Sequence, residues 1–292
     1  MGVVRDPLRG RVRPQPDAAD EEIVAGMLAV PPERWAVLTG AGISTDSGIP
    51  DYRGPTSTPR APMTVQMFLS HPAQRSRYWA RSWIGWQRME RVHPNEGHRA
   101  LARIGPLGII TQNVDGLHQE AGSEPVIDLH GRLDRVICLD CGTVIDRDRV
   151  QEALDALNPG FLDTLGVAPE TLETAPDGDV ELEETAHFRV LDCPRCGGVL
   201  KPDVVYFGES VPRPRVDAAF ALLGSAAGLV VLGSSLAVHS GLRFVRAAVR
   251  EELPVVIVTD GPTRADELPV RRSVSRVADF LRTWEDALGR AI

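Results

Sequence analysis

Four cysteines in two closely spaced pairs are the residues of this sequence whose spacing most clearly predicts chemistry. Cys138 and Cys141 form one C-x-x-C motif, Cys193 and Cys196 form the second, and a glycine follows each. In a protein without signs of export, paired C-x-x-C motifs are metal ligands far more often than disulfides. Four thiolates make a closed tetrahedral site, so we expect one structural Zn²⁺. A thioredoxin-type dithiol is the weaker alternative because it needs only one pair.

A glycine-rich turn follows a short apolar run near the start of the chain, and residues 36–54 read AVLTGAGISTDSGIPDYRG. The apolar run predicts a buried strand, and Gly40 and Gly42 allow a tight turn that brings backbone N–H groups close to phosphates. The spacing departs from G-x-G-x-x-G because position 45 is threonine, so a purely structural turn is an open alternative. The polar residues that crowd the same stretch favour a ligand site: Ser44, Asp46, Asp51, Tyr52 and Arg53.

Other apolar runs also end in small or hydrogen-bonding residues. Predicted strands at 108–110, 126–127, 228–232 and 254–258 are followed by TQNVD, LHG, GSS and TDG. The carboxyl ends of parallel strands meet at one edge of a sheet, so these groups should border one crevice. His130 lies in this set and suits general-base work because the unperturbed pKa of imidazole is about 6.5, although an isolated histidine is more often structural.

Helical patterns alternate with these strands, at 21–30, 95–104, 216–226, 241–251 and 277–288. The alternation predicts the α/β class, with a doubly wound, Rossmann-like parallel sheet built from 21–54, 98–131 and 201–292. Residues 55–97 are too long for a simple connection and predict a loop with a helical cap. Residues 132–200 predict a zinc module with an acidic insert at 158–184, and residues 1–20 a disordered tail.

Composition narrows the functional classes. The 292 residues carry a formal net charge of −8 without a basic stripe, which argues against nucleic acid as a partner. No apolar run approaches the roughly 20 residues of a membrane span, and the N-terminus lacks the apolar core of a signal peptide. We therefore expect no membrane partner, a cytoplasmic location and a monomer.

Six motifs occur in an order that resembles the sirtuins, the NAD-dependent protein-lysine deacylases. They are GAGISTDSGIPDYRG, TQNVD, LHG, the paired C-x-x-C knuckles, PDVVYFGE at 202–209 and GSSLAV at 233–238. The resemblance covers about residues 21–288, and the ordered set is far more specific than any one motif. The strings RYWARSW and LGSSLAVHSGLRF are most similar to the sirtuin-4 branch and bacterial class II sirtuins.

The resemblance implies a role for each motif. NAD is the implied co-substrate, and His130, Asn113 and Asp115 the implied catalytic residues. The remaining cofactor-binding residues would be Gly40, Ala41, Gly42, Ile43, Ser44, Ile49, Asp51, Tyr52, Arg53, Gln112, Val114, Gly233, Ser234, Ser235, Thr259, Asp260, Gly261 and Val277. An acylated lysine of a protein substrate would pair as an added strand with Val204, Val205, Phe207 and Gly208.

The implied reaction is acyl transfer to the ribose of NAD. The acyl oxygen attacks the ribose carbon as nicotinamide leaves, and His130 acts as base on a ribose hydroxyl, giving O-acyl-ADP-ribose. Tyr78 and Arg81 have the Tyr-x-x-Arg spacing of desuccinylase relatives but stand several residues early, so acetyl is the default acyl group.

Other functions are open at this stage. ADP-ribosyl transfer or a lipoamidase activity would use the same fold. A hydride-transferring oxidoreductase lacks an obvious acidic ribose partner about 20 residues after Gly42. A non-catalytic zinc interaction module is the remaining alternative.

Overall fold

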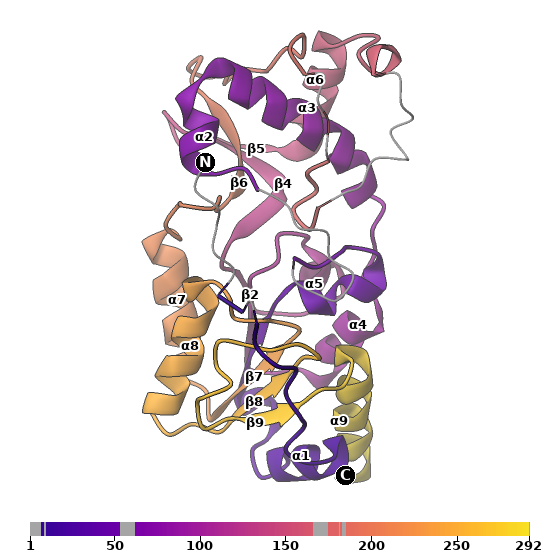
Figure 1. Cartoon of the computed structure of the whole chain (residues 1–292), viewed down its shortest axis with the longest axis vertical. Helices are drawn as coiled ribbons and strands as arrows, with labels where there is room; N and C mark the ends of the chain where they lie inside the picture. The colour runs from indigo at the N-terminus through magenta and orange to yellow at the C-terminus, as the bar shows by residue number, and fades with distance from the viewer. Residues whose placement is uncertain are drawn as a thin grey trace.

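A six-stranded parallel sheet forms the body of the molecule in the computed structural model (Figure 1), which describes residues 7–8, 10–52, 62–165, 175–180, 182 and 185–291. The strand order is β3-β2-β1-β7-β8-β9, and every pair is parallel. The strands are β1 (Trp35–Thr39), β2 (Gly108–Thr111), β3 (Val126–Asp128), β7 (Gly228–Leu232), β8 (Val255–Val258) and β9 (Arg271–Ser273). The predicted α/β doubly wound fold is confirmed.

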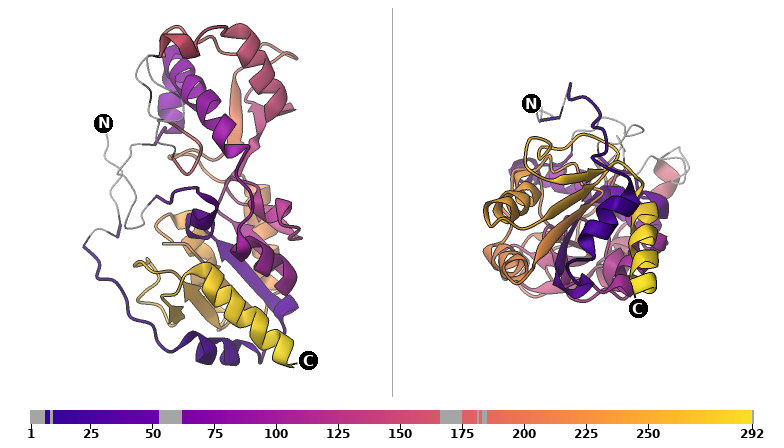
Figure 2. Two further views of the ribbon diagram at one scale, coloured as in Figure 1. Left: turned by 90° about the vertical axis from the view of Figure 1, so that its right-hand side faces the viewer. Right: turned by 90° about the horizontal axis from the view of Figure 1, so that it is seen from below.

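Helices cover both faces of this sheet. Successive side chains of its central strands point to opposite faces, and each face packs into its own apolar core. Trp35 and Val37 of β1 pack with α1, α4 and α9, whereas Ala36 and Leu38 pack with α7 and α8. Figure 2 (right) shows the sheet between these two groups. The helices are α1 (Asp20–Met27), α4 (Glu96–Ile104), α5 (Leu117–Glu120), α7 (Arg213–Gly224), α8 (His239–Arg250) and α9 (Val277–Ala291), with short 3₁₀ turns η1 (Pro32–Arg34), η2 (Ala41–Ile43) and η3 (Thr45–Ser47).

The centre of the sheet is also the point where the strand order changes direction. β1 pairs with β2 on one side and with β7 on the other, so Thr39 lies level with both Thr111 and Leu232. The loops that leave these three strand ends run to different parts of the molecule. Open α/β sheets bind ligands in the crevice that such a divergence creates.

A smaller lobe is built from the two long insertions (Figure 1). Its antiparallel sheet has the order β5-β4-β6, with α2, α3 and α6 around an aromatic core. The fully buried Arg147 guanidinium lies 5.2 Å from the ring centres of both Trp79 and Trp86 and donates to the Ser82 carbonyl, which ties α6 to α3. The elements are β4 (Gly131–Cys138), β5 (Val144–Asp146), β6 (Leu200–Val204), α2 (Val65–Ser70), α3 (Pro72–Met89), α6 (Arg147–Leu157) and η4 (Leu162–Thr164).

The start of the chain differs from the disordered tail expected for residues 1–20. The Asp17 N–H donates to the Arg272 carbonyl, and the Asp17 carboxylate accepts from the Arg272 N–H. The physical reason is that β9 is an edge strand whose backbone groups need partners. Among the described residues, no helix combines the length and the apolar character that crossing a bilayer requires.

Gly131 offers a sharp test of this architecture. Its φ is +84°, and a Cβ there would lie 1.8 Å from the Asp203 carbonyl oxygen. We expect Gly131→Ala to lower the free energy of unfolding by about 2 kcal/mol or more, measured by denaturant titration. Gly26→Ala is the matched control, since nothing lies within 4 Å of a Cβ at that helical position, and it should be neutral or stabilising. Equal stability of the two variants would contradict the packing described here.

Candidate functional site

Two glycine turns lie against each other at the carboxyl ends of β1 and β7. The Gly40 N–H donates to the Leu232 carbonyl, and the Gly42 N–H donates to the Gly233 carbonyl at 2.9 Å. A Cβ on Gly42 would lie 2.8 Å from the Gly233 Cα, and a Cβ on Gly40 would lie 2.8 Å from the Ser234 Cβ. Any larger side chain would push the turns apart, so glycine is required at both positions.

A partly buried cluster of an amide, a hydroxyl and a carboxylate lies beside these turns. The Ser44 hydroxyl donates to Asp115 Oδ2 at 2.7 Å and accepts from Asn113 Nδ2 at 3.0 Å. The Leu117 N–H donates to Asp115 Oδ1 at 3.0 Å. Burial raises the pKa of the Asp115 carboxyl, and the bonds from Leu117 and Ser44 oppose that rise. The cluster fixes the directions of three polar side chains at the edge of the sheet.

His130 is held in one tautomer. Its Nδ1 donates to the Gln112 carbonyl at 2.9 Å, so Nε2 carries the lone pair and accepts from the Ser240 hydroxyl at 2.8 Å. Burial lowers the pKa of His130 to about 4, and nearby Arg215 and Arg243 act in the same direction, while the Gln112 carbonyl opposes them. The ring is therefore neutral at neutral pH. The pKa departs from the unperturbed value of about 6.5 because burial outweighs the one bond that favours the cation.

The segment after β6 runs between the body and the lobe. The Val205 N–H donates to the His130 carbonyl at 2.8 Å, and the Val65 N–H donates to the Phe207 carbonyl at 3.1 Å. Glu209 accepts from the Tyr206 N–H and from Lys201 Nζ, the only lysine of the chain. Backbone and side-chain bonds thus hold residues 204–209 beside His130.

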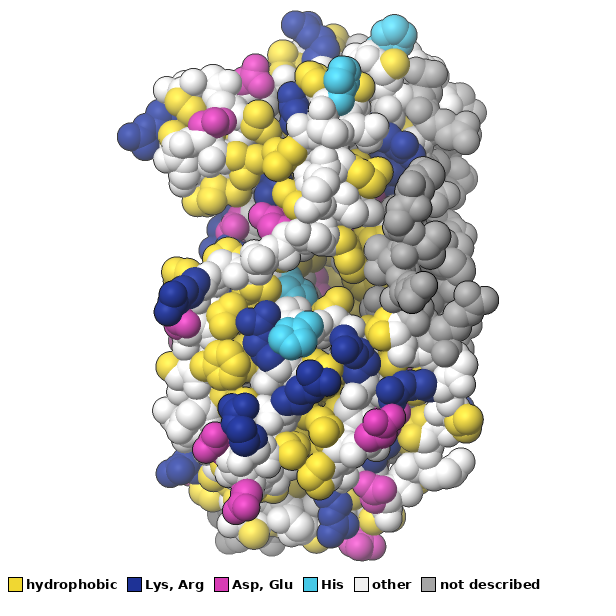
Figure 3. Space-filling model, turned by 60° about the vertical axis from the view of Figure 1, so that its left-hand side comes forward, with side chains coloured by type: hydrophobic (Ala, Val, Ile, Leu, Met, Phe, Trp, Pro, Cys, Tyr) yellow, Lys and Arg dark blue, Asp and Glu magenta, His cyan; other side chains and the backbone are white. Residues whose placement is uncertain are grey.

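The predicted site residues surround one cavity of about 1260 Å³. Figure 3 shows the hollow between lobe and body, with histidine side chains near it. Arg53 lies outside the described residues. The structure brings these predicted residues to the cavity: Gly40, Ala41, Gly42, Ile43, Ser44, Ile49, Asp51, Tyr52, Gln112, Asn113, Val114, Asp115, His130, Val204, Val205, Phe207, Gly208, Gly233, Ser234, Ser235, Thr259, Asp260, Gly261 and Val277.

Several cavity residues were missed by sequence reasoning. Ser240 and Arg243 lie at the start of α8, where the sequence predicted a helix at 241–251 and no site residue. Tyr206 lies in the predicted substrate segment but was not among the predicted site residues, and Tyr78 was considered only for its spacing with Arg81. Three further unexpected lining residues, Leu8, Arg11 and Arg13, come from the expected tail, which had no motif to mark it.

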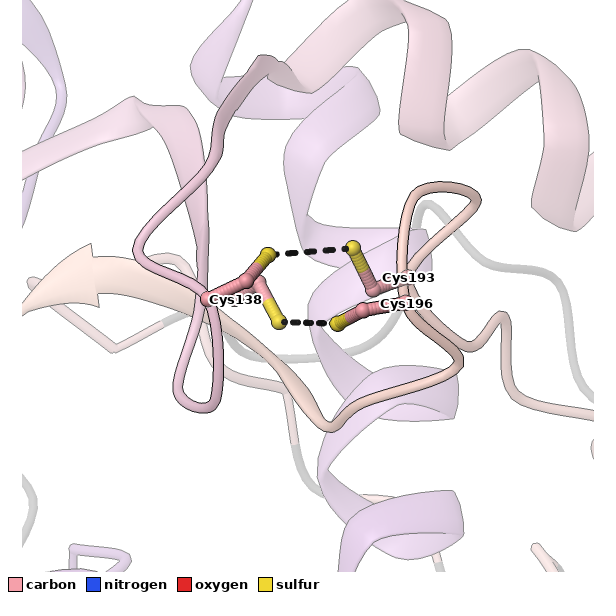
Figure 4. Close-up of side chains that lie close together, drawn as sticks. Cys138, Cys193 and Cys196 are labelled. Atoms are coloured by element: carbon pink, nitrogen blue, oxygen red, sulfur yellow. Dashed lines mark hydrogen bonds between the residues drawn. The ribbon is translucent and has the colours of Figure 1, made fainter.

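The four cysteine sulfurs converge at the far end of the lobe (Figure 4). Cys138 Sγ lies 3.5 Å from Cys196 Sγ, and Cys141 Sγ lies 3.8 Å from Cys193 Sγ. A disulfide requires about 2.05 Å, whereas Zn–S bonds of about 2.3 Å place tetrahedral sulfurs about 3.8 Å apart. The arrangement fits a closed, structural Zn²⁺ site.

The fold and the site define an α/β protein with a nucleotide-type crevice and a four-cysteine metal module. The model of the Sir2 family matches residues 40–240, and the chain belongs to this family, the sirtuins. It is 51% identical over 275 residues to NAD-dependent protein deacetylase 1 of Mycobacterium avium (strain 104), covering 93% of this chain and 96% of that protein.

Solved structures of the family show the same architecture. A Sir2 structure with a p53 peptide and NAD⁺ matches with a TM-score of 0.65 and 30% identity, covering 88% of this chain and 93% of that one. A Sir2 variant with a deacetylated p53 peptide and 3′-O-acetyl ADP ribose matches with a TM-score of 0.67 and 27% identity, covering 92% and 98%.

Metal removal tests the cysteine site. We expect about one zinc per chain by elemental analysis, and we expect Cys138→Ser to lose it and to unfold the lobe at 132–200, because a structural metal contributes folding free energy. Circular dichroism and limited proteolysis would report the unfolding. Leu139→Ser, in the same knuckle but without a ligand atom, should keep both the zinc and the lobe. Unchanged stability after complete chelation would count against a structural role.

Acid pH tests the buried histidines. Burial lowers the pKa of His98 to about 4 and that of His118 to about 3. Between the unfolded pKa of about 6.5 and these values, the unfolded chain binds protons that the folded chain does not, so stability falls as pH falls, by about 1.4 kcal/mol per pH unit for each histidine. His118→Gln should flatten this slope in denaturant titrations, while the exposed His187→Gln should not. Equal slopes in both variants would contradict neutral burial of His118.

Proposed function

We propose that this chain is an NAD-dependent protein-lysine deacylase with acetyl as its default acyl group. The observation that carries the proposal is the single cavity that joins three features. These are the paired glycine turns, the Asn113 and Asp115 cluster, and a neutral His130 with its lone pair on Nε2. Relatives half identical in sequence are named NAD-dependent protein deacetylases, which supports the same reaction here.

The residues of the crevice fit NAD. The turns after β1 and β7 lack side chains at Gly40, Gly42 and Gly233, and all three glycines line the cavity, so phosphates can approach the backbone there. The cavity of about 1260 Å³ exceeds the range of about 300–1,000 Å³ typical of drug-sized ligands, which leaves room for a dinucleotide and an acylated side chain. When bound, NAD supplies the ribose carbon to which the acyl oxygen bonds as nicotinamide departs.

Three groups of residues in the chain have separate roles: binding the nicotinamide end, accepting a proton and binding the substrate backbone. Asn113 and Asp115, fixed by Ser44, hold and orient the nicotinamide end. His130 Nε2 accepts the proton of a ribose hydroxyl, and the Gln112 carbonyl keeps the opposite nitrogen protonated, so the lone pair stays on Nε2. Residues 204–208 pair with the substrate backbone, which places the acylated lysine beside His130.

The proposal extends to the setting of the enzyme. Its substrates are acyl-lysine proteins rather than nucleic acid, in keeping with the net charge of −8, and it acts in the cytoplasm as a monomer. We also propose the division predicted from the sequence: a NAD-binding domain at 21–54, 98–131 and 201–292, a cofactor loop and cap at 55–97 and a zinc module at 132–200. Within the predicted tail at 1–20, residues 11, 13 and 17 are hydrogen-bonded to the body. ADP-ribosyl transfer and lipoamidase activity are alternatives on the same site, without an observation that favours either.

Replacement of His130 separates its role from cofactor binding. We expect His130→Ala to lower kcat for an acetyl-lysine peptide by about 10²–10⁴-fold, the usual contribution of a positioned base, with little change in NAD affinity. Nicotinamide release and calorimetric titration of NAD would measure the two effects. Ser240→Ala removes only the hydroxyl that donates to Nε2 and should keep most of the turnover. A His130→Ala enzyme with normal turnover would remove His130 from its assigned role.

The low pKa of His130 gives a second test. The base works in its neutral form, so kcat/KM should hold as pH falls through 6.5 and decline only as pH approaches the pKa of about 4. Folding at each pH must be verified by circular dichroism, because the buried histidines also weaken stability there. An acidic limb centred near pH 6.5 in a fully folded enzyme would contradict the burial of the ring.

A further inference from the structure

The chain before α1 forms an N-terminal strap, defined here as Leu8 and residues 10–17. Figure 2 (left) traces it along the body toward the opening below the lobe. Arg11 Nη1 donates to the Thr263 carbonyl at 3.0 Å, and Arg13 Nε donates to the Asp260 carbonyl at 2.9 Å. Asp17 adds two hydrogen bonds to Arg272 of β9. The strap is therefore hydrogen-bonded to the body at Asp260, Thr263 and Arg272, which lie between the end of β8 and β9.

Three side chains of the strap line the cavity. They are Leu8, Arg11 and Arg13, whereas Val12, between the two arginines, is 85% exposed. A turn at Gly10, in which the Arg11 N–H donates to the Leu8 carbonyl, separates Leu8 from the arginines. Leu8 is only 7% exposed although it lies close to the end of the chain. The segment therefore forms a wall of the cavity.

Arg13 brings an unshared positive charge to this wall. Its bond runs to a backbone carbonyl, and no carboxylate of the described residues forms an ion pair with it. Arg11 differs, since Glu267 lies 3.6 Å away. Arg276, which also lines the cavity, is paired with Asp46. Arg13 is thus a cation available to an anion that enters beside Asp260.

We propose that the strap is the outer wall of the subsite for the adenosine diphosphate half of NAD, with Arg13 as a binding residue for its diphosphate. This inference rests on the proposed function, with NAD as co-substrate. Thr259, Asp260 and Gly261, which the family resemblance implies as cofactor-binding residues, line the same cavity. The Arg13 side chain donates to the Asp260 carbonyl, so a ligand that binds to this loop lies close to the Arg13 guanidinium. Guanidinium groups bind phosphate oxygens well because their N–H donors form a planar fork.

The test uses ADP-ribose as the probe, titrated by calorimetry into the full chain, so the readout does not depend on turnover. We expect Arg13→Gln to weaken ADP-ribose about three- to fivefold, the effect of one partly exposed charge pair, and to reduce the salt dependence of binding. Arg13→Lys keeps the charge and should recover most of the affinity. If Arg13 acted only by holding the strap in place, Arg13→Gln would leave the salt dependence of ADP-ribose binding unchanged. Arg13→Lys would then not restore the affinity.

Two controls match the change. Val12→Ala alters the same strap on its outer side, and Arg250→Gln removes an equal charge from the exposed end of α8. Both should bind ADP-ribose as the native chain does. A chain that starts at residue 18 should lose at least as much affinity as Arg13→Gln.

The outcomes separate this inference from the function it rests on. If the native chain binds ADP-ribose and Arg13→Gln binds it equally well, the strap assignment is overturned while the enzyme assignment stands. If removal of the strap tightens binding, the segment obstructs the subsite and the assignment is likewise overturned. If the native chain binds no ADP-ribose, the proposed function fails, and the inference fails with it.

Discussion

The contact between two bare backbone turns is the constraint on which the site depends. β1 lies between β2 and β7, so the turns after β1 and β7 must share the space above the centre of the sheet. They approach to a distance at which a single Cβ on Gly42 would lie 2.8 Å from the backbone of Gly233. Because the turn is that tight, η2 begins at once and delivers Ser44 to Asp115. The polar cluster therefore depends on the strand order, which brings the two turns together, and on the glycines, which let them pack closely.

The polar groups beneath the crevice are buried together, and this sets their protonation. Thr39 bonds to His118 Nε2 at 2.9 Å, and the rings of His98 and His118 lie 5.0 Å apart. The same exclusion of water raises the pKa of Asp115 and lowers those of the histidines, since burial disfavours each charged form. A histidine buried in its neutral form lowers the free energy of unfolding at acid pH. At neutral pH the same histidine has a free lone pair that can accept a proton.

The sequence predicted the parts of the site that local pattern determines. An apolar run followed by glycine located β1 and its turn, and the cysteine spacing located the metal module. β9 was missed because Arg271 and Arg272 carry no apolar pattern. Arg272 is buried because its guanidinium pairs with Asp266 and donates to the Gly261 carbonyl. The pKa of His130 and the bond from Ser240 could not be predicted from the sequence. Both depend on contacts made in the folded chain, and Ser240 lies 110 residues from His130.

The metal site and the crevice lie at opposite ends of the same two strands. β4 leaves the body directly after His130 and ends at Cys138, and β6 returns from beside the second cysteine pair to Val204. In the antiparallel register Cys138 lies opposite Leu200, and Gly131 lies opposite Val204. A zinc bound by both knuckles therefore fixes the distal ends of a ladder whose proximal ends lie beside His130 and the segment proposed to bind substrate. β4 and β6 are paired at both ends, with a register shift between Gly131 and Val136. A metal that never approaches the reaction is therefore tied through the two strands to the position of Val204 beside His130.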